Sequence, residues 1–85
     1  CVSVNDVFVM NAWGKDQGVG EDVAMLADGE GEWSTAMGLE TNIPGLGLRC
    51  RRFSLVADDG VVTQLNVEEP GEFKVSTAEH MLGQL

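Results

Sequence analysis

The sequence is poor in positive charge. Its 85 residues include five lysines and arginines against fourteen acids, which gives a net charge of −9 at pH 7. Binding to nucleic acid or to an anionic membrane surface depends on many cationic contacts with phosphate. The composition therefore disfavours both nucleic acid and membranes as partners.

Cysteine, histidine and long apolar stretches are also scarce. Two cysteines without C-x-x-C spacing and one histidine do not supply a closed zinc site, so we expect neither a metal nor a cofactor. The cysteines could form a disulfide, although free thiols in a reducing compartment are the favoured interpretation. The sequence shows no basic leader and no apolar run long enough to span a membrane. We therefore expect a cytoplasmic protein by default.

What the sequence does contain is enough for one globular domain, since 44% of its residues are hydrophobic. Residues 1–4 have the pattern of a short buried strand, and a helix N-cap follows at Asn5 or Asp6. Domains rarely begin inside a core strand. We therefore expect residues 1–85 to be the C-terminal portion of a single domain of a longer protein.

Apolar spacing and turn residues predict the element order β-α-β-α-β-β-α. The expected elements are a strand at 1–4, a helix at 6–16, a buried strand at 23–27, a helix at 30–37, a loop at 39–48, strands at 53–57 and 61–67, and a last helix capped by Ser76. The expected inward-facing residues of the first two helices are Val9, Ala12, Trp13, Trp33, Ala36 and Met37. The Asp59-Gly60 pair is a strong hairpin signal between the last two strands. This order, with a terminal antiparallel hairpin followed by a helix, fits an α/β thioredoxin-like fold.

Three of the five cations lie within four positions, in the segment R-C-R-R at 49–52. Such a cluster in an acidic chain indicates an anion partner. If the segment is a strand, Cys50 and Arg52 share one face, whereas Arg49 and Arg51 share the other. The three arginines are therefore not expected to serve one purpose.

Four segments resemble the type II, or Prx5-like, peroxiredoxins. They are C-V-S-V-N-D-V-F-V-M-N-A-W-G at 1–14, M-L-A-D-G at 25–29, R-R-F-S at 51–54 and L-N-V-E at 65–68. The resemblance implies a thioredoxin-like fold and a homodimer. It also implies reduction of hydrogen peroxide and alkyl hydroperoxides by a cysteine thiolate, which glutaredoxin, glutathione or thioredoxin recycles.

The family's peroxidatic cysteine lies in a P-x-x-x-T-x-x-C motif, which none of the 85 residues matches. By resemblance, Cys1 corresponds to a second cysteine proposed as a resolving or auxiliary thiol. Cys50 lies where relatives have a small or variable residue, and Val75 lies where animal members carry their resolving cysteine. Without a thiol to resolve, Cys1 is expected to be a small buried hydrophobic residue.

The resemblance assigns Arg52 to the family arginine that lowers the thiol pKa and stabilises the departing peroxide oxygen. The alternative is that Arg52 is one solvated charge on an edge strand. Arg49 and Arg51 are interpreted as solvent-facing or ion-paired charges.

The expected loop at 39–48 is unusually apolar, and exposed apolar loops usually contact a partner. By resemblance this region is near the peroxide pocket and the dimer contact, and its candidate residues are Ile43, Leu46 and Leu48. Two functions therefore remain open. The chain is either the C-terminal part of a thiol peroxidase, inactive by itself, or a non-enzymatic thioredoxin-like module that binds a protein partner.

Overall fold

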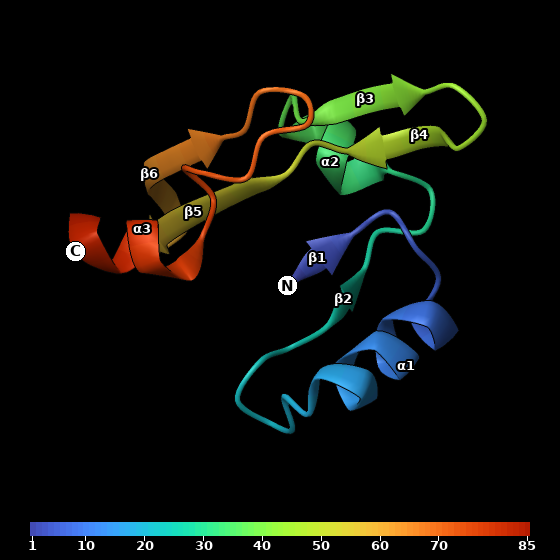
Figure 1. The fold of residues 1–85 in the computed structure, drawn as a ribbon, viewed down its shortest axis with the longest axis horizontal. Coiled ribbons are helices and arrows are strands. Elements are labelled where there is room, and N and C mark those ends of the chain that lie inside the picture. The colour runs from blue at the N-terminus through green and yellow to red at the C-terminus, as the bar shows by residue number, and fades with distance from the viewer. The chain divides into compact units, whose positions relative to one another are not determined.

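The computed structural model describes residues 1–85, which form two compact units, Cys1–Cys50 and Arg51–Leu85 (Figure 1). We call them the N-terminal and the C-terminal unit. In chain order the elements are β1 (Val2–Ser3), α1 (Val7–Gln17), β2 (Leu26–Ala27), α2 (Glu32–Ala36), β3 (Glu40–Ile43), β4 (Gly47–Cys50), β5 (Phe53–Asp58), β6 (Val61–Val67) and α3 (Ala78–Gln84). The predicted order is recovered, with two strands added.

The N-terminal unit begins with a β-α-β arrangement in which β1 and β2 pair in parallel and α1 connects them. Asp6 caps α1 as predicted, because its carboxylate accepts a hydrogen bond from Val9 N at 2.8 Å. Gly18 ends the helix in the left-handed conformation, at φ 63°. Helix α1 lies against β2 (Figure 1).

The buried face of α1 differs from the predicted one. Its buried residues are Met10 and Gly14, whereas all three residues predicted to face inward are exposed, Trp13 at 42%. Gly14 explains the difference, because a Cβ there would lie 2.9 Å from Cγ of Met25. The helix thus packs through a glycine that allows close approach, which a search for apolar spacing does not find.

The first strand pair is also shorter and more exposed than predicted. Cys1 is exposed and precedes β1, so the prediction of a buried Cys1 is wrong. The backbone nitrogen of Cys1 donates to the carbonyl of Ala24 at 2.9 Å. In the predicted buried strand 23–27 only Leu26 and Ala27 pair, because β1 offers two residues as partners.

Helix α2 is organised by a buried carboxylate. Asp28 accepts hydrogen bonds from Trp33 N at 3.0 Å, Ser34 N at 2.8 Å and Ser34 Oγ at 2.7 Å. Burial raises the pKa of Asp28, but the hydrogen bonds from Ser34 and Trp33 outweigh it and hold the pKa below its usual value. Ser34 is the buried residue of this helix, so the predicted inward face is wrong at Trp33 and Ala36, which are exposed, whereas Met37 is half-buried.

The predicted loop at 39–48 is instead the antiparallel hairpin β3–β4. Its register pairs Glu40 with Cys50 and Ile43 with Gly47. The strands have little apolar alternation, which is why the sequence did not indicate them, yet three residues of β4, Leu48, Arg49 and Cys50, are half-buried. A tight turn closes the hairpin, in which Leu46 N donates to Ile43 O at 2.9 Å and Gly45 adopts φ 82°.

The C-terminal unit contains the hairpin that the sequence predicts. Strands β5 and β6 are antiparallel, and Asp59 and Gly60 form a two-residue turn with φ 51° and 79°. Two positive φ angles are typical of the type I′ turn, whose twist matches that of the strands. Helix α3 contacts β5. Its N-cap is Thr77, which accepts from His80 N at 3.0 Å, so the predicted cap at Ser76 is wrong.

Candidate functional site

The R-C-R-R segment is not one continuous strand. Strand β4 ends at Cys50 and β5 begins at Phe53, so Arg51 and Arg52 belong to neither. The predicted alternation of faces therefore does not apply to them, and each arginine has its own environment. Arg49 and Cys50 belong to the N-terminal unit and the other two arginines to the C-terminal unit.

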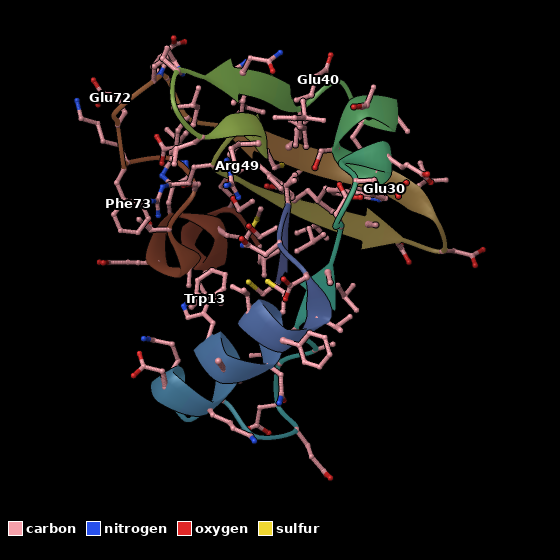
Figure 2. The ribbon with its side chains drawn as sticks, turned by 90° about the vertical axis from the view of Figure 1, so that its right-hand side faces the viewer. Trp13, Glu30, Glu40, Arg49, Glu72 and Phe73 are labelled. Atoms are coloured by element: carbon pink, nitrogen blue, oxygen red, sulfur yellow. The ribbon has the colours of Figure 1, made fainter.

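Arg52 is an exposed cation whose position is fixed by neighbours in the C-terminal unit. Its guanidinium carbon lies 4.7 Å from the centre of the Phe73 ring, a cation–π geometry. Figure 2 shows Phe73 on the segment between β6 and α3, where 62% of the residue is exposed. The backbone carbonyl of Arg52 accepts a hydrogen bond from Glu68 N at 2.9 Å. The cation is thus accessible, and both its backbone and its guanidinium group have partners.

Arg51 and Arg49 are half-buried and support the backbone, so the interpretation of both as solvent-facing or ion-paired is wrong. Arg51 Nη2 donates to the backbone carbonyl of Glu68 at 2.9 Å. Arg49 Nη1 donates to the carbonyl of Val4 at 2.8 Å and to Asn5 Oδ1 at 3.4 Å, which connects β4 to the segment between β1 and α1. Arg49 is labelled in Figure 2.

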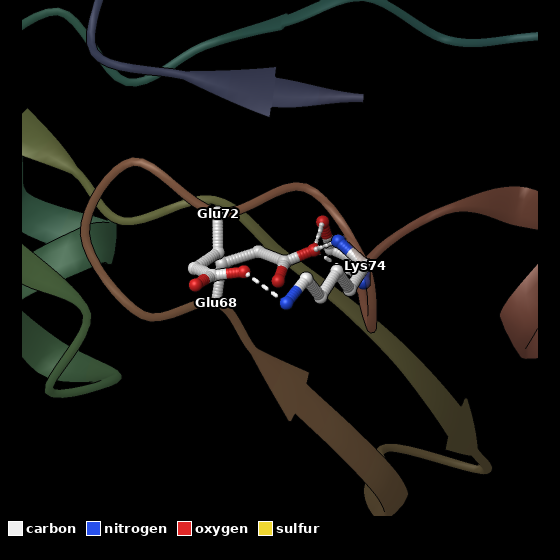
Figure 3. Close-up of polar contacts among 4 residues, drawn as sticks. Glu68, Glu72 and Lys74 are labelled. Atoms are coloured by element: carbon white, nitrogen blue, oxygen red, sulfur yellow. Dashed lines mark hydrogen bonds and ion pairs between the residues drawn. The ribbon is translucent and has the colours of Figure 1, made fainter.

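Glu68 is the central residue around Arg52, and sequence reasoning missed it. It is 4% exposed, and its Oε2 atom accepts hydrogen bonds from Lys74 N at 2.7 Å, Ser76 N at 2.8 Å and Ser76 Oγ at 2.6 Å (Figure 3). Burial raises its pKa, but the hydrogen bonds from Ser76, Val75 and Lys74 dominate and lower it to about 2. The available signal was an acid two positions before the Pro70-Gly71 turn and a serine five positions after that glycine.

The remaining candidate residues lie in the N-terminal unit. Cys1 is exposed, Cys50 is half-buried on β4, and neither is in a disulfide. On the β3–β4 hairpin, Leu46 is 59% exposed and Ile43 also faces outward. Leu48 is half-buried and packs against Gly31, where an added Cβ would lie 2.5 Å from Cδ2 of Leu48. The apolar set therefore divides into one packing residue and two exposed ones.

The structure contains no cluster of three or more histidine, cysteine, aspartate or glutamate residues able to hold a metal ion. No helix is both long and apolar enough to cross a bilayer.

Comparison with known proteins identifies the family. The redoxin family profile matches residues 1–82. Peroxiredoxin-2E, a chloroplastic protein of Arabidopsis thaliana, is 51% identical over 100% of this chain and 38% of its own length. The crystal structure of reduced Prx3 from Vibrio vulnificus with hydrogen peroxide is 50% identical, with a TM-score of 0.93, over 99% of this chain and 55% of that one. A Burkholderia cenocepacia crystal structure, 47% identical, superposes with a TM-score of 0.97 over 100% of this chain and 52% of that one.

The fold is therefore that of a thioredoxin-like α/β protein. This chain spans between 38% and 55% of the length of these relatives. The chain belongs to the redoxin family, and within it to the type II, Prx5-like peroxiredoxins.

Proposed function

We propose that this chain supplies the arginine-bearing part of a thiol-dependent peroxidase. The observation that supports the proposal is Arg52, an accessible cation in the segment R-R-F-S whose guanidinium group is held against Phe73. The substrates would be hydrogen peroxide and alkyl hydroperoxides, and the reductant glutaredoxin, glutathione or thioredoxin. A relative of this chain, Prx3 from Vibrio vulnificus, has been crystallised with hydrogen peroxide. A homodimer and a cytoplasmic location remain predictions.

In this reaction a cysteine thiolate attacks one oxygen of the peroxide. An S–O bond forms, the O–O bond breaks, the sulfur is oxidised to a sulfenic acid, and the second oxygen leaves as hydroxide or alkoxide and takes up a proton. A fixed guanidinium group beside the reacting atoms favours the thiolate and stabilises the charge on the departing oxygen. Arg52 would perform both tasks. Cys1, which is exposed, is proposed as a resolving or auxiliary thiol.

The thiolate itself is expected from the P-x-x-x-T-x-x-C motif, which residues 1–85 do not contain. We therefore expect the 85-residue chain alone to show no peroxide consumption above background when coupled to glutaredoxin or thioredoxin. Turnover that Cys1→Ser abolished would contradict this expectation and make Cys1 the nucleophile.

A fusion that places the first half of a type II peroxiredoxin ahead of Cys1 tests the role of Arg52. Arg52→Ala should lower the rate of peroxide reduction about a hundredfold, the usual loss for one charge contact to a developing oxyanion. Arg52→Lys should rescue only part of the rate, because a point charge cannot replace the planar guanidinium. Lys15→Ala removes one exposed cation from α1 and is the charge-matched control. A rate unchanged by Arg52→Ala would refute the assignment.

The second candidate function is a non-enzymatic interaction module. It is favoured by the apolar side chains on α1 that face solvent, above all Phe8, which is 81% exposed. The same fusion separates the two candidates. An inactive fusion in which Phe8→Ser abolishes binding to a protein partner would favour the interaction module.

A further inference from the structure

Glu68 contacts the arginine segment through its backbone and the segment that follows Phe73 through its carboxylate. Through its backbone it donates to the carbonyl of Arg52 at 2.9 Å and accepts from the side chain of Arg51 at 2.9 Å. Through its carboxylate it accepts hydrogen bonds from the amides of Lys74, the residue that directly follows Phe73, and of Ser76, three positions after Phe73. One residue therefore fixes both partners of the cation–π contact.

The segment between Glu68 and Ser76 is a closed loop. It turns at Pro70-Gly71, where Gly71 adopts φ 79° and Glu72 N donates to Glu69 O at 2.9 Å. The loop has no strand partner of its own. Instead, the carboxylate of Glu68 accepts hydrogen bonds from the backbone amides of Lys74 and Ser76 and from the hydroxyl of Ser76. Hydrogen bonds to a charged acceptor are about twice as strong as neutral ones. We call this arrangement the Glu68 clamp.

The geometry points to Glu68 as a positioning residue for Arg52: by holding the 69–76 loop closed, it keeps the Phe73 ring against the guanidinium group and limits the directions in which that group can point. This inference rests on the proposed peroxidase function. An exposed arginine without such a partner samples many rotamers, and each productive contact then costs side-chain entropy. A ring that holds the guanidinium in place lowers that cost before the peroxide binds.

Other charged groups near the loop do not provide the same closure. Glu69, Glu72 and Lys74 line, with Glu68, a hollow of about 360 Å³. The ion pair between Lys74 Nζ and Glu72 Oε2, at 2.9 Å, is on the surface, with 76% of the lysine side chain exposed (Figure 3). Glu72→Gln thus removes one negative charge from the same loop without touching the clamp. It is the matched control for Glu68→Gln.

Limited trypsin digestion of the 85-residue chain tests whether the clamp closes the loop. Cleavage after Lys74 needs the loop to open, and cleavage after Lys15, in α1, is an internal reference. Glu68→Gln and Ser76→Ala should raise the ratio of Lys74 to Lys15 cleavage, about tenfold for Glu68→Gln. Glu72→Gln should leave it unchanged. Equal ratios in all variants would refute the clamp. Ser76→Ala keeps the carboxylate, so the test holds even if Glu68→Gln does not fold.

Kinetics of the fusion protein test whether the closed loop positions Arg52. Glu68→Gln and Phe73→Leu should each lower kcat about tenfold and raise the pKa of the peroxidatic thiol, with Glu72→Gln near wild type. A loop that opens while both the rate and the thiol pKa stay at wild-type values would overturn the positioning role and leave the proposed function standing. A fusion insensitive to Arg52→Ala would refute the function, whereas the digestion result would be unaffected.

Discussion

The two units each contain a buried carboxylate with the same set of partners. Asp28 in the N-terminal unit and Glu68 in the C-terminal unit both accept two backbone amides and one serine hydroxyl. In both, these hydrogen bonds hold the pKa of the carboxyl group below its ordinary value. The physical solution is the same, because a buried charge is tolerated only where donors replace the water it has lost.

The difference lies in what each carboxylate holds. Asp28 binds the first turn of α2, so it acts as the cap of a short helix whose own N-cap, Gly31, offers no side chain. Glu68 binds a loop that has no regular structure and that carries Phe73 beneath Arg52. One carboxylate therefore completes a structural element, whereas the other shapes the surroundings of a candidate functional residue.

The largest loss of stability is expected from a change beside Asp28. In Gly31→Ala the new Cβ would lie 2.5 Å from Cδ2 of Leu48, in a backbone conformation of φ 73°. Strain and overpacking together should lower the free energy of unfolding by about 2 to 4 kcal/mol. Gly38→Ala is the control, because its φ is 72° and nothing lies within 4 Å. It should cost about 1 to 2 kcal/mol. Tryptophan fluorescence during denaturant unfolding reports on this unit, and equal losses would show that Leu48 moves aside freely.

Neutralising each carboxylate should loosen a different part of the chain. Asp28→Asn should speed amide exchange about tenfold at Trp33 and Ser34, and leave tryptic cleavage after Lys74 unchanged. Glu68→Gln should increase tryptic cleavage after Lys74 and leave amide exchange at Trp33 and Ser34 unchanged. Hydrogen exchange followed by mass spectrometry measures the amide exchange, and limited trypsin digestion measures the cleavage. Simultaneous loosening of both regions in either variant would contradict the independence of the two clusters.

Acid should destabilise the chain through both carboxylates. The pKa of Glu68 is lowered from 4.5 to about 2, so its contribution to stability is complete above pH 4.5 and is lost as the pH falls toward 2. The pKa of Asp28 is lowered from 3.8, so its contribution is lost below that pH. Thermal melts by circular dichroism should show a Tm that decreases below about pH 4.5. Glu68→Gln should flatten the upper part of this decrease, and an unaltered acid profile would contradict the pKa assignment.

The smallest effect is expected at the surface ion pair of the 69–76 loop. Lys74→Ala removes the contact to Glu72 but keeps the amide that donates to Glu68. Exposed pairs contribute little, so the free energy of unfolding should change by less than about 0.5 kcal/mol. Chemical denaturation monitored by circular dichroism measures it. A larger loss would mean that the surface pair, and not the Glu68 clamp, holds the loop.

Only part of the candidate site was visible in the sequence. Arg52 was found through its resemblance to a family motif, which needs no coordinates. The clamp was not found, because Glu68 and Ser76 are eight positions apart along the chain and only the loop between them brings them together. The role of Arg51 was missed for the same reason, since its partner is a backbone carbonyl seventeen positions away.

The sequence by itself determined the features that depend on near neighbours. Asp6 and Gly18 fix the ends of α1, and Asp59-Gly60 sets the turn of the β5–β6 hairpin, because caps and tight turns are decided within a few residues. Tertiary structure decided which face of α1 is buried, the pairing of β3 with β4, and the burial of Asp28 and Glu68. Those outcomes depend on close approach at glycines and on hydrogen bonds between distant segments, which local pattern does not encode.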